Sequence, residues 1–524
     1  MRRLWLALVA LLGLAAPAGA QPDVLRAVLN LELQVLDPIV TNSNVTRAYA
    51  YLVYDTLVAL DSKGEYRPQM LQGWQVSDDR LTWTFTLREG LEWHDGQPVT
   101  AEDCVASLRR WGAKDGLGSR LMAASKGMRV VNARTFVLEL TWPFSQVIEA
   151  IGKPAALIPF MMPARLASTT PITQAVPESI GSGPYSFNRG EWRSGSLAIF
   201  RRNPRYVPRA EPPDGFAGGK RPLMEQVHFI SMPDIATRVA AITAGEADYL
   251  ELVPGDFIES FRRNRNIRLI EPPPLGSMLG AISLNHLHPP FNNPQARRAF
   301  QLAIDHEEVQ AALGLPRQMR YGFCASIFMC GWPYASEAGV APLRDATLEQ
   351  ARAMLRASGY NNEPLVLLHS MDSTVLNPTS LVIAERARLA GFNVQVASAD
   401  YSTQAQRRNS VEPVERGGWS AMPVVFTGYD MVNPIANYAV AYNCTNNYPG
   451  RYCDPTLTPV IEAFEREADP AKRRELAAQM QGHVHDAGLM AFYGQFYLPA
   501  AHRADVTGVL PVGIPLLYNI ERRR

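Results

Sequence analysis

The spacing of apolar and polar residues predicts a small α+β unit in the first third of the chain. Residues 81–87 alternate Leu, Trp and Phe with Thr, and this period of two indicates a strand with one buried face. Thr100 and Asp103 have the spacing of a capping box, so we expect a helix to begin there. Two further strand-like runs, at residues 128–131 and 135–140, complete the unit.

A different pattern occupies the middle of the chain. Residues 227–231 and 248–252 are strand-like runs, and between them Asp234 is placed to cap a helix and Gly245 to end it. The same order recurs as a strand at 365–369, a helix at 378–390 and a strand at 393–398. A strand–helix–strand order is typical of parallel sheet, so the sequence predicts two α/β units.

The length of the chain indicates more than one core. A chain of 524 residues is too long for a single core, and we expect two lobes. Lobe I is predicted over residues 21–274, with the α+β unit as an inserted subdomain at about 55–180. Lobe II is predicted over 275–487, and residues 488–524 return to complete lobe I. The three consecutive prolines at 272–274 mark the expected first crossing between the lobes.

The N-terminus has the features of a signal peptide. Arg2 and Arg3 precede an apolar run at residues 4–16, and small residues follow at 18–20. The apolar run is shorter than the roughly 20 residues that cross a bilayer, so a membrane anchor is the weaker interpretation. We expect export to the periplasm and cleavage after Ala20, which makes residues 1–20 the signal peptide.

Composition and motifs narrow the class of function. The formal charge of +1 argues against nucleic acid as a partner, because nucleic-acid binding requires a basic face. The chain contains no Gly-x-Ser-x-Gly or His-Glu-x-x-His motif and no paired Ser/His/Asp signature. We therefore expect no catalytic residue, and no pattern indicates a cofactor. A secreted hydrolase remains the alternative from another class.

The five cysteines favour disulfides over a metal site. In an exported chain we expect local pairing of Cys324 with Cys330 and of Cys444 with Cys453. Metal ligation by these four is the alternative, but no neighbouring His gives a zinc-like spacing. Cys104 is left over, and its place on the apolar stripe of the first predicted helix predicts a buried side chain.

An ordered series of motifs resembles one protein family along nearly the whole mature chain. The longest motif runs from Trp74 to Trp111, and shorter ones follow at residues 181–185, 203–206, 234–248 and 289–305. In this order they resemble the peptide/nickel class of extracytoplasmic solute-binding proteins, family 5, which deliver solutes to ABC importers.

The resemblance implies both a fold and a function. The implied fold is the α/β, two-lobed periplasmic binding protein fold of type II, in its large form with an extra α+β subdomain on lobe I. The implied function is non-catalytic capture of a small solute, first of all a short peptide, by closure of the lobes. The implied partners are that solute and the permease subunits of an ABC transporter at the inner membrane, and we expect a monomer.

The resemblance also places a ligand-binding segment at residues 417–434. In peptide-binding relatives a similar Asp-x-x-x-Pro stretch sets its Asp against the α-ammonium group of the peptide, and this maps to Asp430. A carboxylate in a drying cleft favours a cation that donates several hydrogen bonds. The alternative is that Asp430 caps a following helix or turn.

Other residues are weaker candidates for the walls of the cleft. Trp419 and Tyr429 are the nearest aromatic residues, with core packing as the alternative. Asn42 and Ser43 lie in a polar turn where the resemblance implies cleft-lining positions, with a surface turn as the alternative.

Asn433 completes the predicted ligand-binding set and leaves the solute open. Peptide-binding relatives often have an acid immediately before the proline, and this chain has Asn433 there. The inference to a binding protein is unaffected, but nickel chelates, haem, glutathione, opines and sugars remain alternative solutes. A metal site at His286 and His288 is disfavoured, because no acidic or Cys partner accompanies them.

Overall fold

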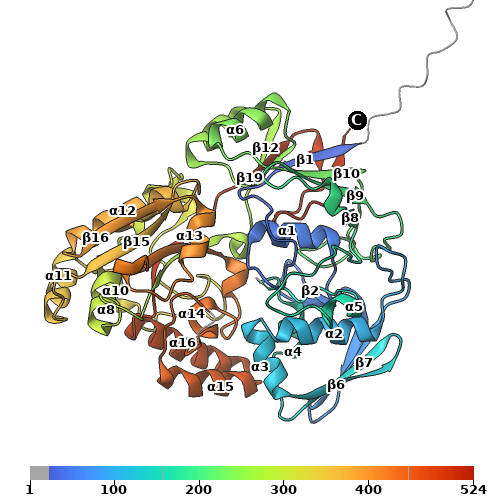
Figure 1. Ribbon diagram of the computed structural model, residues 1–524, viewed down its shortest axis with the longest axis horizontal. Coiled ribbons are helices and arrows are strands. Elements are labelled where there is room, and N and C mark those ends of the chain that lie inside the picture. The colour runs from blue at the N-terminus through green and yellow to red at the C-terminus, as the bar shows by residue number, and fades with distance from the viewer. Residues whose placement is uncertain (1–22, 156, 446–447, 524) are drawn as a thin grey trace, which may run out of the picture.

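Two large β-sheets covered by helices organise the chain into two halves (Figure 1). The computed structural model describes residues 23–155, 157–445 and 448–523, so the predicted signal peptide lies outside the described residues. Among the described residues, no helix is both long and apolar enough to cross a membrane.

The first sheet has seven strands drawn from three separate parts of the chain. Their order is β12 (Ile267–Ile270), β19 (Ala500–Arg503), β11 (Tyr249–Leu250), β1 (Val24–Val28), β10 (Gln226–Ile230), β9 (Leu197–Arg202) and β8 (Tyr185–Phe187). Helix α6 (Ile235–Ala244) connects β10 to β11. Asp234 caps its first turn, and Gly245 follows its last residue with a φ of 80°, which is favourable for glycine. The predicted strand–helix–strand unit is confirmed, with β1 inserted between its two strands and parallel to both.

The second sheet has six strands. Their order is β14 (Arg320–Tyr321), β18 (Met490–Phe496), β13 (Met278–Leu284), β17 (Ala421–Thr427), β15 (Pro364–Ser370) and β16 (Asn393–Ala399). Strands β15 and β16 are parallel and are connected by α12 (Leu376–Leu389), which confirms the second predicted α/β unit. The other helices of this half are α8 (Pro294–Ala303), α9 (His306–Ala311), α10 (Ala341–Arg344), α11 (Leu348–Ala357), α13 (Tyr401–Arg407), α14 (Tyr438–Ala441), α15 (Thr458–Arg466) and α16 (Pro470–Asp486).

A four-stranded antiparallel sheet lies in the region predicted as an inserted subdomain, at the lower right of Figure 1. Its strands are β4 (Leu71–Val76), β5 (Thr82–Leu87), β7 (Thr135–Leu140) and β6 (Ser125–Asn132), accompanied by α2 (Ala101–Gly112), α3 (Gly116–Ala124), α4 (Val147–Gly152) and α5 (Ala164–Ala167). Both hydrogen bonds of the Thr100–Asp103 capping box are present at the start of α2. Cys104 is fully buried on that helix, as predicted.

The chain crosses twice between the two large sheets. The first crossing lies between β12 and β13 and contains the prolines at 272–274. The predicted start of the return segment at residue 488 is wrong. Strand β18 is completely buried and pairs with β13 in the second sheet, so the return follows Phe496 and precedes β19. Gly488 has a φ of 63° and follows the end of α16, so it marks a helix end and not a crossing.

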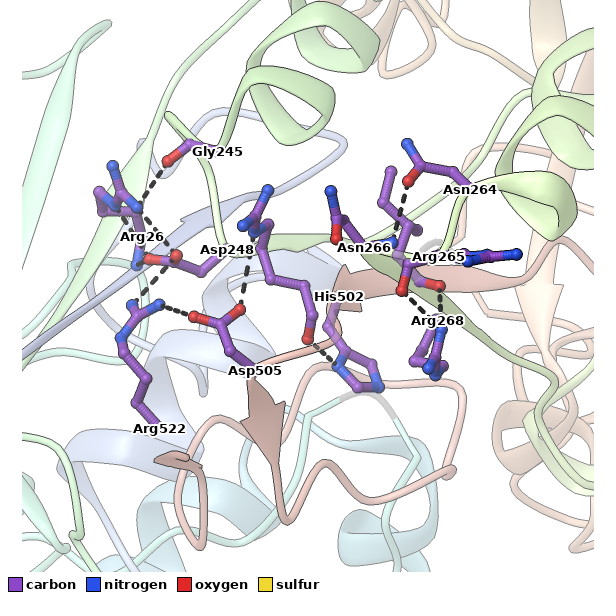
Figure 2. A network of polar contacts seen from close by, with 12 residues as sticks. Arg26, Gly245, Asp248, Asn264, Arg265, Asn266, Arg268, His502, Asp505 and Arg522 are labelled. Atoms are coloured by element: carbon purple, nitrogen blue, oxygen red, sulfur yellow. Dashed lines mark hydrogen bonds and ion pairs between the residues drawn. The ribbon is translucent and has the colours of Figure 1, made fainter. Parts of the chain in front are cut away.

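One buried carboxylate connects the separate parts of the first half (Figure 2). Asp248 accepts hydrogen bonds from the backbone N and the Nε of Arg26 at 2.8 and 2.9 Å, and its other oxygen lies 2.9 Å from Arg26 Nη2. Arg522, on the short C-terminal strand β21 (Glu521–Arg522), lies 3.1 Å from the same carboxylate and 2.8 Å from Asp505. The N-terminal strand, the middle of the chain and the C-terminal segment therefore meet at Asp248.

We predict that Asp248→Asn lowers the free energy of unfolding by about 2–3 kcal/mol, because it leaves charge-assisted donors facing an amide in a buried position. Urea denaturation measures the change. The control is Asp505→Asn, which removes a partly exposed partner of the same Arg522 and should cost less than about 1 kcal/mol. Equal losses for the two variants would contradict the role given to Asp248.

Candidate functional site

A cavity of about 160 Å³ lies between the two halves, where the carboxyl ends of strands from both sheets meet. A single water needs roughly 10–15 Å³ by this kind of measure, so the cavity has room for about ten waters or a small solute. The first half contributes Asn30, Leu31, Asn42, Ser43, Asn44, Val45, Glu251, Leu252, Gly513, Ile514 and Pro515. The second half contributes, among others, Met278, Ser370, Ser373, Val375, Arg408, Val424, Phe426, Asp430, Tyr438 and Tyr448.

Parallel pairing explains why polar residues gather on the first wall. Strands β1 and β11 run side by side, with Val28 opposite Leu250. Asn30 and Glu251 follow these strands and therefore leave the sheet at the same edge, where open α/β sheets place their ligands. The backbone N–H of Asn30 donates to Glu251 Oε2 at 2.7 Å, which orients the carboxylate.

Glu251 places an acidic group in the cavity. Burial raises the pKa of this carboxyl above its ordinary value, while the Asn30 N–H and the charge of Arg238 act to lower it. Within the described part of the chain, Glu251 forms no ion pair at 4 Å or less. Its carboxylate is therefore able to accept a cation from a bound solute.

Arg408 places a basic group on the opposite wall. It follows helix α13 and lies near Tyr448, which it influences electrostatically. Among the described residues, no hydrogen bond or ion pair engages its guanidinium, although the Nε atom is buried. A guanidinium presents paired donors that match the geometry of a carboxylate, so Arg408 is suited to an anionic group of a solute.

The N-terminus of helix α1 (Asn44–Val53) also faces the cavity. The predicted residues Asn42 and Ser43 line it, and Asn42 Nδ2 donates to Tyr438 Oη across the two halves at 3.4 Å. Ser43 occupies the N-cap position, but in the described structure its side chain makes no capping hydrogen bond. The first N–H groups of a helix favour negative charge, so this wall also suits an anion.

Asp430 lies on the cavity wall, but its carboxylate binds other residues of the protein. It belongs to the short 3-10 helix η6 (Gly428–Met431) and forms a capping box with Thr427, so the alternative capping role is present. Its Oδ1 accepts a hydrogen bond from Arg47 Nη2 at 2.9 Å, and both side chains are buried. The sequence-based expectation placed a solute ammonium group at the position that the Arg47 guanidinium occupies here.

Three predicted wall residues lie elsewhere. Trp419 packs in a small core with Leu368 and Met422, and its indole N–H donates to the Arg408 carbonyl at 2.9 Å. Core packing, the alternative interpretation of Trp419, is therefore present. Among the described residues that line this cavity, neither Trp419 nor Tyr429 nor Asn433 appears.

The turn after β17 explains the positions of Tyr429 and Asn433. Tyr429 packs edge-on against Phe216, with ring centroids 4.9 Å apart, and lines a separate cavity. The Asn433 side chain donates to Gln146 at 2.6 Å and accepts from two backbone N–H groups of its own turn. Asn433 therefore stabilises the turn and a contact between the halves.

Four of the cysteines and the two histidines have defined partners. Disulfides join Cys324 to Cys330 and Cys444 to Cys453, as predicted. His286 and His288 hydrogen-bond to the carbonyls of Leu489 and Val411, respectively. Burial lowers the pKa of His286 to about 3, so this ring is neutral. Among the described residues, no group of three or more His, Cys, Asp or Glu side chains is arranged to hold a metal ion.

Sequence reasoning missed Glu251, Arg408 and Arg47. Glu251 lies inside the run predicted as a strand at 248–252, and the carboxyl end of a parallel strand is a signal that could have identified it. Arg408 belongs to no motif in the sequence. Arg47 meets Asp430 across 383 positions, a distance in sequence that no local pattern reports.

Comparison with known proteins gives a consistent set of likenesses. The sequence model described as bacterial extracellular solute-binding proteins, family 5 Middle, matches residues 65–448. A relative from Sinorhizobium fredii (strain NBRC 101917 / NGR234), named a probable peptide ABC transporter periplasmic-binding protein, is 32% identical over 533 residues, covering 97% of this chain and 98% of the relative.

Solved structures share the fold at lower identity. The dipeptide binding protein from Pseudoalteromonas sp. SM9913 in complex with Met-Leu has a TM-score of 0.79 at 19% identity, covering 95% of this chain and 100% of that one. The binding protein AgaA from A. tumefaciens R10 in complex with agropinic acid has a TM-score of 0.77 at 20% identity, covering 96% and 99%.

We predict that replacing either cysteine pair with serine lowers the free energy of unfolding by about 2–3 kcal/mol, because each disulfide closes a short loop of the unfolded chain. Guanidinium chloride denaturation of Cys444→Ser/Cys453→Ser and Cys324→Ser/Cys330→Ser measures the two losses. The control is Cys104→Ser, which removes a thiol that forms no disulfide. Dithiothreitol should shift the unfolding curve of this variant no further than it shifts the curve of the unmodified protein. Full stability in both double variants would contradict the prediction.

Proposed function

Because the chain belongs to the family 5 bacterial extracellular solute-binding proteins and has their two-lobed periplasmic binding protein fold, we propose that it captures a short peptide in the cavity between its lobes. As a member of this family it is a solute-binding component of an ABC importer, with a small solute and permease subunits as partners, and not an enzyme. The protein acts outside the cytoplasm.

One observation carries the proposal of a peptide. Glu251 and Arg408 lie on opposite walls of the same cavity, with no ion pair engaging either group among the described residues. A short peptide has one ammonium and one carboxylate group, and these complement an acidic wall and a basic wall. The ammonium is assigned to Glu251, and the carboxylate is assigned to Arg408 together with the start of α1.

Apolar side chains complete the proposed site. Met278, Val375, Val424 and Phe426 line the space between the charged walls. They offer a surface for the side chains of a peptide without specifying their sequence, as an importer for mixed short peptides requires. The 32% identical relative, named as a probable peptide-binding protein, supports the same solute class.

Closure follows from the position of the charged residues. A solute that contacts Glu251 on one lobe and Arg408 on the other makes both contacts only when the lobes are together, so its binding favours the closed form. Closure also excludes water, which strengthens both charge interactions. We further propose that the protein acts as a monomer in the periplasm after cleavage behind Ala20, which size-exclusion chromatography and N-terminal sequencing of the exported protein test.

We predict that isothermal titration calorimetry finds at least tenfold weaker binding of N-acetyl-Ala-Phe and of Ala-Phe-amide than of Ala-Phe, because each blocked form loses one charge interaction. Glu251→Gln should bind N-acetyl-Ala-Phe and Ala-Phe with equal affinity. Arg408→Gln should bind Ala-Phe-amide and Ala-Phe with equal affinity. The exposed residues Glu246 and Arg416 provide the matched controls Glu246→Gln and Arg416→Gln, which should bind as the unmodified protein does. Equal affinity for the three compounds would rule out the zwitterion site.

We also predict that affinity for Ala-Phe falls on acidification. The Glu251 carboxyl has a raised pKa, so it takes up a proton and loses its charge at a higher pH than an ordinary Glu does. Binding should therefore be full above this pKa and weaken as the pH falls through it. Titrations at a series of pH values should show this loss in the unmodified protein and a reduced loss in Glu251→Gln. An identical pH profile for the two proteins would contradict the assignment.

A further inference from the structure

A buried ion pair joins the two lobes at the wall of the cavity. Arg47 comes from helix α1 of the first lobe and Asp430 from the turn after β17 of the second. Arg47 Nη2 lies 2.9 Å from Asp430 Oδ1, and the two side chains are only 4% and 6% exposed. Charges this deeply buried must be paired, because each one alone carries a large desolvation cost.

The Asp430 carboxylate is oriented independently of Arg47. Its Oδ2 accepts hydrogen bonds from the backbone N–H and the hydroxyl of Thr427 at 3.1 and 2.8 Å. These donors belong to the same lobe and the same turn as Asp430, so they hold the carboxylate in place whether the lobes are open or closed. The Thr427 hydroxyl oxygen also lies 3.4 Å from Arg47 Nη1 and supplies a second contact to the guanidinium.

We infer that Asp430 and Thr427 form a cation subsite of the cavity, which the chain fills with its own Arg47. The subsite accepts a guanidinium or an alkylammonium group, the two cations that match a fixed carboxylate and a neighbouring hydroxyl. With Arg47 in place, the subsite is closed to solutes. Arg47 is thus a specificity-determining residue, since it directs the solute cation to Glu251, an assignment that rests on the proposed function.

The same geometry disfavours a solute with a second cation near this wall. If a solute ammonium group paired with Asp430 in the closed form, Arg47 would remain buried without a carboxylate partner. The lobes would then close less readily on that solute than on one with a neutral side chain. Arg47 therefore acts by exclusion, which is a common basis of specificity.

The first test uses ethylguanidinium chloride as the probe and needs no natural solute. In Arg47→Ala the position of the guanidinium group is vacated, and the probe should raise Tm by about 2–5 °C in a concentration-dependent manner. The unmodified protein and the double variant Arg47→Ala/Asp430→Asn should show no rise beyond that caused by sodium chloride. Arg120→Ala, which breaks another ion pair between the lobes, is the matched control and should also show none. No specific rise in Arg47→Ala would overturn the inference.

The second test covers the case in which Arg47→Ala does not fold. Arg47→Met retains an unbranched side chain and removes the guanidinium group, so a solute cation no longer competes with Arg47 for Asp430. Calorimetry should then show at least a tenfold gain in the preference for Ala-Lys over Ala-norleucine relative to the unmodified protein. An unchanged preference would overturn the inference. If neither dipeptide binds any variant, the proposed peptide function fails, while the rise in Tm caused by ethylguanidinium chloride, measured on Arg47→Met where Arg47→Ala does not fold, still decides the subsite.

Discussion

The fold depends on the buried carboxylate of Asp248, which holds together three parts of a chain that crosses twice between its sheets. Arg26 from the first strand and Arg522 from the last both bind this side chain. Their convergence allows the C-terminal segment to complete the first sheet after the chain has built the second. The result is two lobes joined by short connections near residues 271–277 and 497–499, the arrangement that permits hinge motion.

The binding properties of the cavity depend on its charged side chains. The protein pairs some of these with one another and leaves others to bind a solute. Arg47 and Asp430 neutralise one another across the lobes. Glu251 is held by a backbone N–H, and in the described structure the Arg408 guanidinium has neither a hydrogen bond nor an ion pair. Unpaired charges in a space that loses its water on closure are costly without a complementary ligand, so closure and solute binding favour one another.

This arrangement suits binding and transport. The charged groups of the cavity come from opposite walls, as recognition of a solute with two charged ends requires. The turn that carries Asp430 shows how one motif serves two purposes. Its hydrogen bonds with Thr427 cap the turn, and the same bonds aim the second carboxylate oxygen at the partner lobe.

The sequence by itself determined the features that depend on neighbours within a few residues. The capping box at Thr100, the helix from Asp234 to Gly245 and the two local disulfides were all predictable, because their partners are close in the chain. The ordered motifs also predicted the family and the two-lobed fold. The lining of the cavity was predictable only in part. Of the six residues predicted to line it, Asn42, Ser43 and Asp430 do so in the structure, whereas Trp419, Tyr429 and Asn433 lie elsewhere.

Only the tertiary structure decided the remaining features, since they depend on residues that are far apart in the chain. The assignment of β18 to the second sheet comes from its pairing with β13, more than 200 positions earlier. The buried ion pair of Asp430 is formed with Arg47, which lies 383 positions away in the chain. Hydrogen bonds within a turn act over a few residues and leave a pattern in the sequence, whereas a buried charge is paired by whichever residue the packing of the lobes brings beside it.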